Sequence, residues 1–249
     1  MIGSIALPNG SRPWAAAYDP SNKDIYVTDL AHPAVYLIHN LTRIHVVRSS
    51  SFTGGTWSIA WDPSAKLMLC VNLHGLLVGI NGTSISGSIH VGSSYSEGMA
   101  FDSRANEVLI TIYAKNNVAG VNASHPFSGP QLNIRVGKFP VGIASDPATG
   151  YDYVTNFRGN SVDVINGSGG SLGTIPVGNG PDGVSIDTAK HEVFVANHYS
   201  NNVSVISGLS AVRTLAFTPP NNYLTGVVYD PATKLVYVTA LNYKVFIVT

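Results

Sequence analysis

A pattern of about 40 to 45 residues recurs six times along this chain of 249 residues. Each copy carries an aspartate at the end of a short apolar stretch, then a turn, then a stretch rich in tyrosine and valine. Successive aspartates lie 43, 40, 44, 41 and 43 residues apart: Asp19, Asp62, Asp102, Asp146, Asp187 and Asp230. Such a period, with several short strands per repeat, is the sequence signature of a β-propeller. We therefore predict an all-β chain with one domain over residues 1–249, a six-bladed β-propeller.

Each repeat resolves into four short strands. The first is built from small apolar residues, as in residues 14–18, which suits the crowded centre of a ring. The second is almost continuously apolar, as in residues 67–71, which is typical of a strand covered on both faces. The third alternates between polar and apolar residues, and the fourth is shorter and more polar. The polarity of the fourth strand indicates an outer edge, where Pro176 is tolerated.

The sixth repeat stops after its third strand. At the other end of the chain, GSIALPNG resembles GTIPVGNG, a fourth strand of the interior repeats. We therefore predict that residues 3–7 pair as the outer strand of the last blade. This N-terminal strand would close the ring and leave no exposed sheet edge.

The six aspartates have a local structural role in this interpretation. Four of them precede proline, an arrangement that favours a type I turn in which the carboxylate accepts backbone N–H groups. The single cysteine, Cys70, lies in the apolar run LMLCV and is predicted to be a buried apolar residue.

The composition excludes several classes of partner. The net charge is zero and only 11% of residues are charged, which argues against a nucleic-acid-binding face. The longest apolar stretches are far shorter than the ~18 residues that a membrane-spanning segment needs, so we expect no membrane insertion. The hydrophobic fraction of 45% is enough to form a packed core.

Two segments carry a family resemblance. YVTNFRGNSVDVING at 153–167 and VFVANHYSNNVSVISG at 193–208 resemble the YVTN β-propeller repeat of archaeal and bacterial surface proteins. The preceding PVGIASDPATG and GPDGVSIDTAK also match that family, whereas LITIY in the third repeat departs from it. The resemblance implies an extracellular or cell-surface propeller that binds a protein or carbohydrate, and it implies no chemistry. We expect a monomer or part of a longer polypeptide.

Alignment on the anchor aspartates predicts a ring of side chains at one end of the central axis. Five residues before each anchor lie Trp14, Trp57, Glu97, Val141, Asp182 and Thr225. Propeller ligands bind where loops meet the channel, so Trp14, Trp57, Glu97 and Asp182 are candidate ligand-binding residues at the channel mouth. Aromatic faces opposite acids suit a sugar ring or an organic cation.

Two of these residues also suggest a metal site. EGMAFD and PDGVSID locally resemble segments of six-bladed calcium-dependent lactonases, which implies that Glu97 and Asp182 hold calcium. That family also uses asparagine ligands, where this chain has Val141 and Thr225. The alternatives are a binding pocket that uses no cofactor and a plain channel lining.

A second predicted ring lies ten residues after each anchor and includes Asn72, Asn156 and Asn197. An asparagine at the end of a strand can hold the following loop, and lining the pocket is the alternative. His74 and His198 follow two of these residues on opposite blades, so we expect them to be loop residues and not a metal pair.

Five N-x-S/T sequons are candidate glycosylation sites: Asn40, Asn81, Asn122, Asn166 and Asn202. The first four fall at the same turn of successive repeats, so turn chemistry is the favoured interpretation and glycosylation the alternative.

The sequence therefore favours a non-enzymatic binding or scaffold propeller. The alternatives are a calcium-dependent lactonase or hydrolase acting at the channel mouth and a structural spacer in a surface array.

Overall fold

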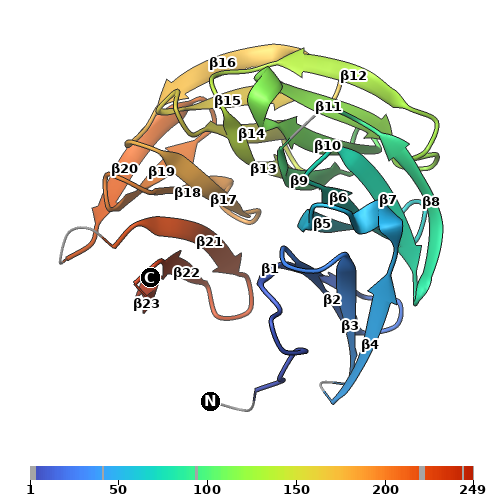
Figure 1. Cartoon of the computed structure of the whole chain (residues 1–249). Coiled ribbons are helices and arrows are strands. Elements are labelled where there is room, and N and C mark those ends of the chain that lie inside the picture. Colours follow the sequence, from blue (N-terminus) through green and yellow to red (C-terminus); the bar gives the residue numbers. More distant parts are fainter. Residues whose placement is uncertain (1–3, 41, 93–94, 219–221, 243, 249) are drawn as a thin grey trace.

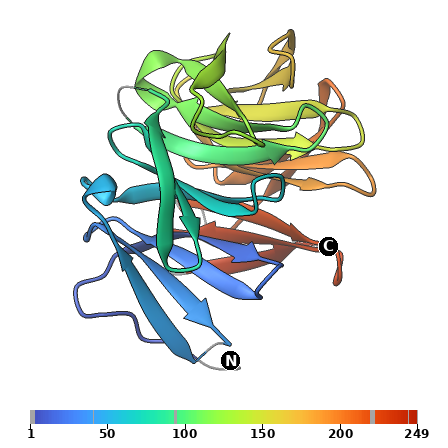
Figure 2. The ribbon, with the colours of Figure 1, turned by 90° about the vertical axis from the view of Figure 1, so that its right-hand side faces the viewer.

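Six antiparallel sheets stand around a central axis in the computed structural model, the arrangement of a six-bladed β-propeller (Figure 1). The structure describes residues 4–40, 42–92, 95–218, 222–242 and 244–248. Seen from the side, the blades stack around the axis as a twisted disc (Figure 2). Two short 3-10 segments, η1 at Ser50–Phe52 and η2 at Tyr113–Lys115, lie in loops. No helix in the described part of the chain has the length and apolar character needed to cross a membrane.

The strands follow the predicted order from the axis outward. The first strands of the blades are β1 Pro13–Asp19, β5 Thr56–Asp62, β9 Ser96–Asp102, β13 Pro140–Asp146, β17 Pro181–Asp187 and β21 Leu224–Asp230. The second strands are β2 Asp24–Asp29, β6 Leu67–Asn72, β10 Glu107–Ile112, β14 Tyr151–Asn156, β18 Glu192–Asn197 and β22 Leu235–Ala240. The third strands are β3 Ala34–His39, β7 Leu76–Asn81, β11 Asn117–Asn122, β15 Ser161–Asn166, β19 Asn202–Ser207 and β23 Lys244–Val248. The fourth strands are β4 Arg43–Arg48, β8 Ser84–His90, β12 Pro130–Arg135, β16 Ser171–Pro176 and β20 Ser210–Ala216.

The anchor aspartates make the predicted turns. Each accepts the backbone N–H of the residue two positions later, at distances such as 2.8 Å for Ser21 on Asp19 and 2.9 Å for Ser64 on Asp62. The same bond recurs at the other four anchors: Asp102, Asp146, Asp187 and Asp230. This carboxylate therefore fixes the hairpin between the first and second strand of every blade.

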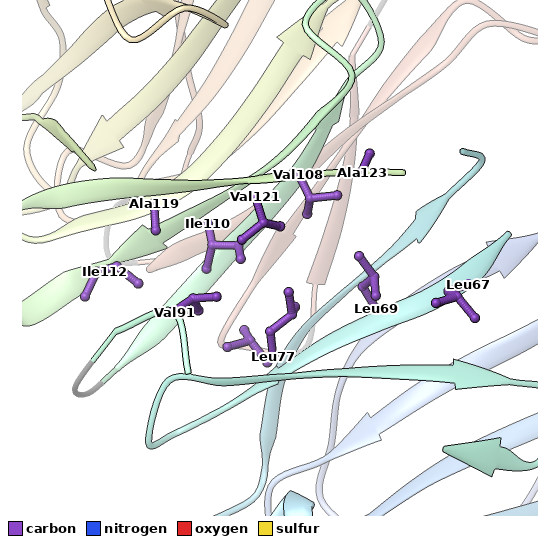
Figure 3. Close-up of a cluster of buried hydrophobic side chains, with 11 residues drawn as sticks. Leu67, Leu69, Leu77, Val91, Val108, Ile110, Ile112, Ala119, Val121 and Ala123 are labelled. Carbon is purple, nitrogen blue, oxygen red and sulfur yellow. The ribbon is translucent and has the colours of Figure 1, made fainter. Parts of the chain in front are cut away.

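The core is divided among the spaces between consecutive blades. Figure 3 shows one such cluster, in which Leu69 and Leu77 of blade two face Val108 and Ile110 of blade three. Four similar clusters join blades one and two, three and four, four and five, and five and six. Cys70 is fully buried in the first of these four, as predicted. Most of the hydrophobic stabilisation therefore comes from packing one blade on the next.

Tyrosine and threonine of the second strand link neighbouring blades. The Tyr153 hydroxyl donates to the Gly208 carbonyl of the next blade at 3.1 Å, and Tyr26 donates to Gly82 in the same way at 3.2 Å. The Thr155 hydroxyl donates to the Asp182 carbonyl of the next blade at 2.7 Å. These contacts give the recurring Tyr-Val-Thr sequence a structural reason.

The predicted closure of the ring is not found. The sixth sheet has three strands, ordered β21-β22-β23, and residues 4–12 form no strand beside β23. Residue 3 of the predicted strand lies outside the described residues. The N-terminal segment instead stays on blade one, because Arg12 N–H donates to Asp29 at 2.8 Å and Ser11 Oγ contacts the Tyr36 hydroxyl at 2.7 Å.

Blade six is therefore not joined to blade one: Val228, Val245 and Ile247 of blade six are more than half exposed. The ribbon is open between β21 and β1, and this opening is called the wedge below (Figure 1). The first strands pack on one another from β1 through β5, β9, β13 and β17 to β21. Among the described residues, no comparable packing joins β21 back to β1.

Candidate functional site

The predicted mouth residues occupy one structural position in every blade. Trp14, Trp57, Glu97, Val141 and Asp182 are each the second residue of a first strand. Each first strand also has a break in its register with the second strand at this point, for example between Pro140 and Ile143. Irregularities of this kind re-aim side chains at the rims of β-structures. The repeat thus brings one side chain from each of blades one to five to the same cavity, whereas Thr225 of blade six does not line it.

Threonine hydroxyls of the second strands hold these irregularities in place. The Thr155 hydroxyl accepts the Gly142 N–H at 2.8 Å, and the Thr111 hydroxyl accepts the Gly98 N–H at 2.8 Å. Glycine is needed at such positions, because a Cβ on Gly142 would lie 2.6 Å from the Asp182 carbonyl oxygen of the next blade. The backbone beside the mouth is therefore held by both its own blade and the neighbouring one.

These side chains line a single cavity of about 400 Å³. The structure thus brings together the four predicted mouth residues, Trp14, Trp57, Glu97 and Asp182. Three further side chains complete the wall: Tyr113, Phe157 and His198. The indole rings of Trp14 and Trp57 meet edge to face, with centroids 5.3 Å apart and planes at 64°. The Nε1 of Trp57 is buried and donates to no described group.

The two carboxyl groups of the mouth lack a cationic partner among the described residues. Burial raises the pKa of Glu97 to about 7. Burial, and then the charge of Glu97, raises the pKa of Asp182 to about 7. Near neutral pH both carboxyls are therefore partly protonated, and a bound cation would favour their ionised forms. Strongly shifted carboxyls in a cleft mark a candidate functional site.

The remaining wall is aromatic. His198 donates its Nδ1 proton to the Leu224 carbonyl at 2.9 Å and lies 5.8 Å from the Phe157 ring centroid. The rings of Tyr113 and Phe139 are tilted at 53° with centroids 4.5 Å apart, and the Arg158 guanidinium lies 5.0 Å from the Phe139 ring centroid. Aromatic surface thus surrounds the two carboxyls.

The second predicted ring lies behind this wall. Asn72, Asn156 and Asn197 are 3%, 0% and 0% exposed and do not line the cavity. Asn72 accepts the N–H groups of His74 and Leu76 at 2.9 Å each, so it holds the loop that follows. The amides of Asn156 and Asn197 likewise donate to residues at the start of the third strand. Their contacts are those of loop-holding residues.

Three residues of the cavity wall were not predicted from the sequence, and they lie one position after the ring of asparagines. Tyr113, Phe157 and His198 lie eleven residues after their anchors, and each directly follows a second strand. His198, expected to be an ordinary loop residue, is therefore part of the mouth. His74, at the corresponding loop of blade two, is exposed and lies outside the cavity.

The cavity offers few protein ligands for a calcium ion. Glu97 and Asp182 bring two carboxyls to the cavity, but no three His, Cys, Asp or Glu side chains of the described residues gather in a way that could hold a metal. Calcium takes about six to eight oxygen ligands, so water would have to supply most of them.

The sequons take the predicted positions. Asn40, Asn81, Asn122 and Asn166 each lie at the turn between the third and fourth strand of a blade. Asn166 accepts the Gly170 N–H at 2.7 Å, which is turn chemistry. Asn202 opens β19 and accepts the Asn197 amide at 2.7 Å.

A larger groove of about 770 Å³ lies along the outer side of blade three. Its wall combines asparagine with Lys115 and Arg135 and holds no shifted acid. The smaller mouth combines aromatic surface with convergent polar groups, which is typical of ligand sites.

Comparison with known proteins gives structural relatives only. No family model and no curated protein match the chain. Virginiamycin B lyase from Staphylococcus aureus has a TM-score of 0.84 at 14% identity, over 96% of this chain and 81% of that chain. A catalytically inactive variant of that lyase with quinupristin has a TM-score of 0.80 at 10% identity, over 98% and 86%. A chain of the mitotic checkpoint complex has a TM-score of 0.84 at 11% identity, over 97% and 75%. At these identities the likeness shows the propeller fold alone.

Proposed function

We propose that this propeller is a binding module whose channel mouth takes a small ligand with a positively charged group. One observation carries the proposal: two half-buried carboxyls without a cationic partner among the described residues share a cavity with the Trp14–Trp57 pair. A cation on such a ligand would interact with the carboxyls, and its apolar part would cover the indole rings. A cavity of about 400 Å³ suits a ligand of a few hundred daltons.

Aromatic walls also stack on sugar rings, so a neutral carbohydrate is the competing ligand class. The carboxyls distinguish the two classes. A cation requires the ionised pair, so its affinity should rise between about pH 6 and 8, as carboxyls with pKa values of about 7 lose their protons. The affinity of a neutral sugar should change little over that range.

The proposal is tested by calorimetric titration with organic amines, their neutral isosteres and a set of glycans. We expect an amine to bind, and the Glu97→Gln/Asp182→Asn pair or either Trp14→Ala or Trp57→Ala to weaken binding at least ten-fold. Tyr18→Ala is the matched control, because this residue lies on the same strand as Trp14, is 52% exposed and is outside the cavity. Amine or glycan binding that survives the loss of both tryptophans would refute a ligand site at the mouth.

A calcium-dependent lactonase or hydrolase is the second candidate, favoured by the two carboxyls alone. In that case a cation held by Glu97 and Asp182 would polarise a substrate carbonyl. Calcium should then raise the melting temperature of the wild type and leave the Glu97→Gln/Asp182→Asn pair unchanged. An unchanged wild-type melting temperature would remove this candidate. A structural spacer in a surface array would show neither ligand binding nor a response to calcium. The proposed binding module is placed outside the cell or at the cell surface.

A further inference from the structure

The wedge between blades six and one exposes a face that is buried in every other blade. In blade five, Val203 and Val205 of β19 point toward blade six and are 0% exposed. The corresponding residues of blade six, Val245 and Ile247 of β23, are 59% and 61% exposed. Val228 of β21 adds a third exposed side chain, at 55%. Such a contiguous apolar face is characteristic of an interaction surface.

A second observation comes from the tyrosine seven residues after the anchor. In blades one and four, Tyr26 and Tyr153 donate to the carbonyl of a turn glycine in the following blade. Tyr237 occupies the same position in blade six. Its hydroxyl makes no hydrogen bond to any described residue. Blade six thus has the donor of a blade-to-blade contact, and its acceptor is missing.

The sheet edge of blade six is also unpaired. The other five third strands each pair with a fourth strand, as β19 does with β20. In the described residues, β23 pairs only with β22. Across the wedge, Tyr18 of blade one is 52% exposed, whereas the corresponding Ile186 of blade five packs against blade four. Both walls of the wedge are therefore built as blade-to-blade contacts.

We propose that the wedge is the seat of one further blade of the same repeat type. A blade is the expected occupant because, at each of the five interfaces between consecutive blades, the equivalent faces are covered by a neighbouring blade. The incoming blade covers Val245 and Ile247 and presents a turn carbonyl to Tyr237. Residues 4–7, which resemble the fourth strands of other blades in sequence, supply its fourth strand.

The chain itself provides the probe. A copy of residues 208–249 joined after Thr249 continues the repeat in register, because β23 corresponds to β19 and residue 208 follows β19. This extended chain supplies the fourth strand of blade six and three strands of the next blade. The matched control carries Val→Asp at the copies of Val236 and Val238, the residues that face the preceding blade.

Hydrogen exchange on β23, together with the molar mass in solution, tests the seat. We expect the extended chain to be monomeric and its β23 amides to exchange at least ten-fold more slowly than in residues 1–249 or in the control. Tyr237→Phe should speed that exchange about five-fold in the extended chain and leave residues 1–249 unchanged, since a net hydrogen bond contributes ~1 kcal/mol. Exchange equal to that of the aspartate control would overturn the proposal.

Two other results bear on the occupant. If residues 1–249 form a dimer that Val245→Asp dissociates, a second copy occupies the face and the proposal is wrong. If the extended chain does not fold, Val245→Thr/Ile247→Thr in residues 1–249 decides. An unchanged melting temperature agrees with an uncovered face, and a fall of several degrees shows that the face is already covered and overturns the proposal.

Discussion

Replacing Asp152 by valine should stabilise this protein, and the gain should grow as the pH rises. Asp152 lies on β14, is 0% exposed, and neither carboxylate oxygen has a hydrogen-bond partner among the described residues. Its position, six residues after the anchor, is apolar in the other five repeats, with valine in three of them: Val108, Val193 and Val236. The repeat itself therefore supplies the replacement side chain.

The magnitude follows from the pKa. Burial is the main cause that raises the pKa of Asp152 to about 7, and the nearby charges of Asp102 and Glu107 add to it. The Ser145 hydroxyl opposes this rise without the geometry of a full hydrogen bond. The shift from 3.8 to about 7 corresponds to at most ~4 kcal/mol, at ~1.4 kcal/mol per pKa unit.

The sign of the effect is set by linkage. The folded state holds the Asp152 proton more tightly than the unfolded state, so this residue is least unfavourable below pH 4. Stability is lost as the pH rises from the unfolded pKa of 3.8 to the folded pKa of about 7, and the loss is complete above that. Between about pH 4.5 and 8, the advantage of Asp152→Val over the wild type should grow by ~3 kcal/mol.

Urea unfolding of both proteins at these two pH values measures the difference directly. Comparing the two proteins cancels the contributions of other shifted acids, such as Glu97 and Asp182. Asp152→Asn is the control, because it removes the charge but leaves a buried amide to satisfy, so it should flatten the pH dependence with a smaller gain in stability. The reasoning fails if the advantage of Asp152→Val is the same at both pH values.

Three further outcomes follow from the same contacts. Thr155→Val should lower the free energy of unfolding in urea by ~1–3 kcal/mol, because it leaves the Gly142 N–H and the Asp182 carbonyl without a partner. Thr239→Val, at the exposed equivalent position, is the control, and an equal loss in both variants would contradict this. The Glu97→Gln/Asp182→Asn pair should raise the melting temperature more at pH 8 than at pH 5. Burial raises the pKa values of both carboxyls to about 7, so the wild type carries their destabilising charges only at the higher pH. An equal rise at the two pH values would count against this explanation. Cys70, which is fully buried and whose thiol pKa burial raises, should react with a disulfide reagent only at the rate of unfolding, and rapid labelling of the native protein would disprove this.

The repeat made most of the fold predictable because its signals are local. An aspartate that caps a turn and a Tyr-Val-Thr strand act within a few residues, so the order of strands and the shape of each blade could be inferred. Five of the six side chains in the first predicted ring line the mouth for the same reason. The repeat places them at one position of one strand.

What could not be predicted depends on geometry between blades. Residues 4–7 resemble a fourth strand, but which sheet edge they reach depends on the angles between blades, which the sequence does not state. Tyr113, Phe157 and His198 were missed because the ring next to theirs has the more conspicuous asparagines. Only the structure shows that those asparagines turn inward to hold loops, while the next residues form the aromatic wall.

A ring with one unjoined interface behaves thermodynamically as a line with two ends. Each interior blade loses two apolar interfaces on unfolding, whereas blades one and six lose one each, so the free energy of opening should fall from the middle of the chain toward both ends. Unfolding in residues 1–249 thus begins at an end blade and proceeds blade by blade. A joined ring would have no such end and would have to break somewhere first.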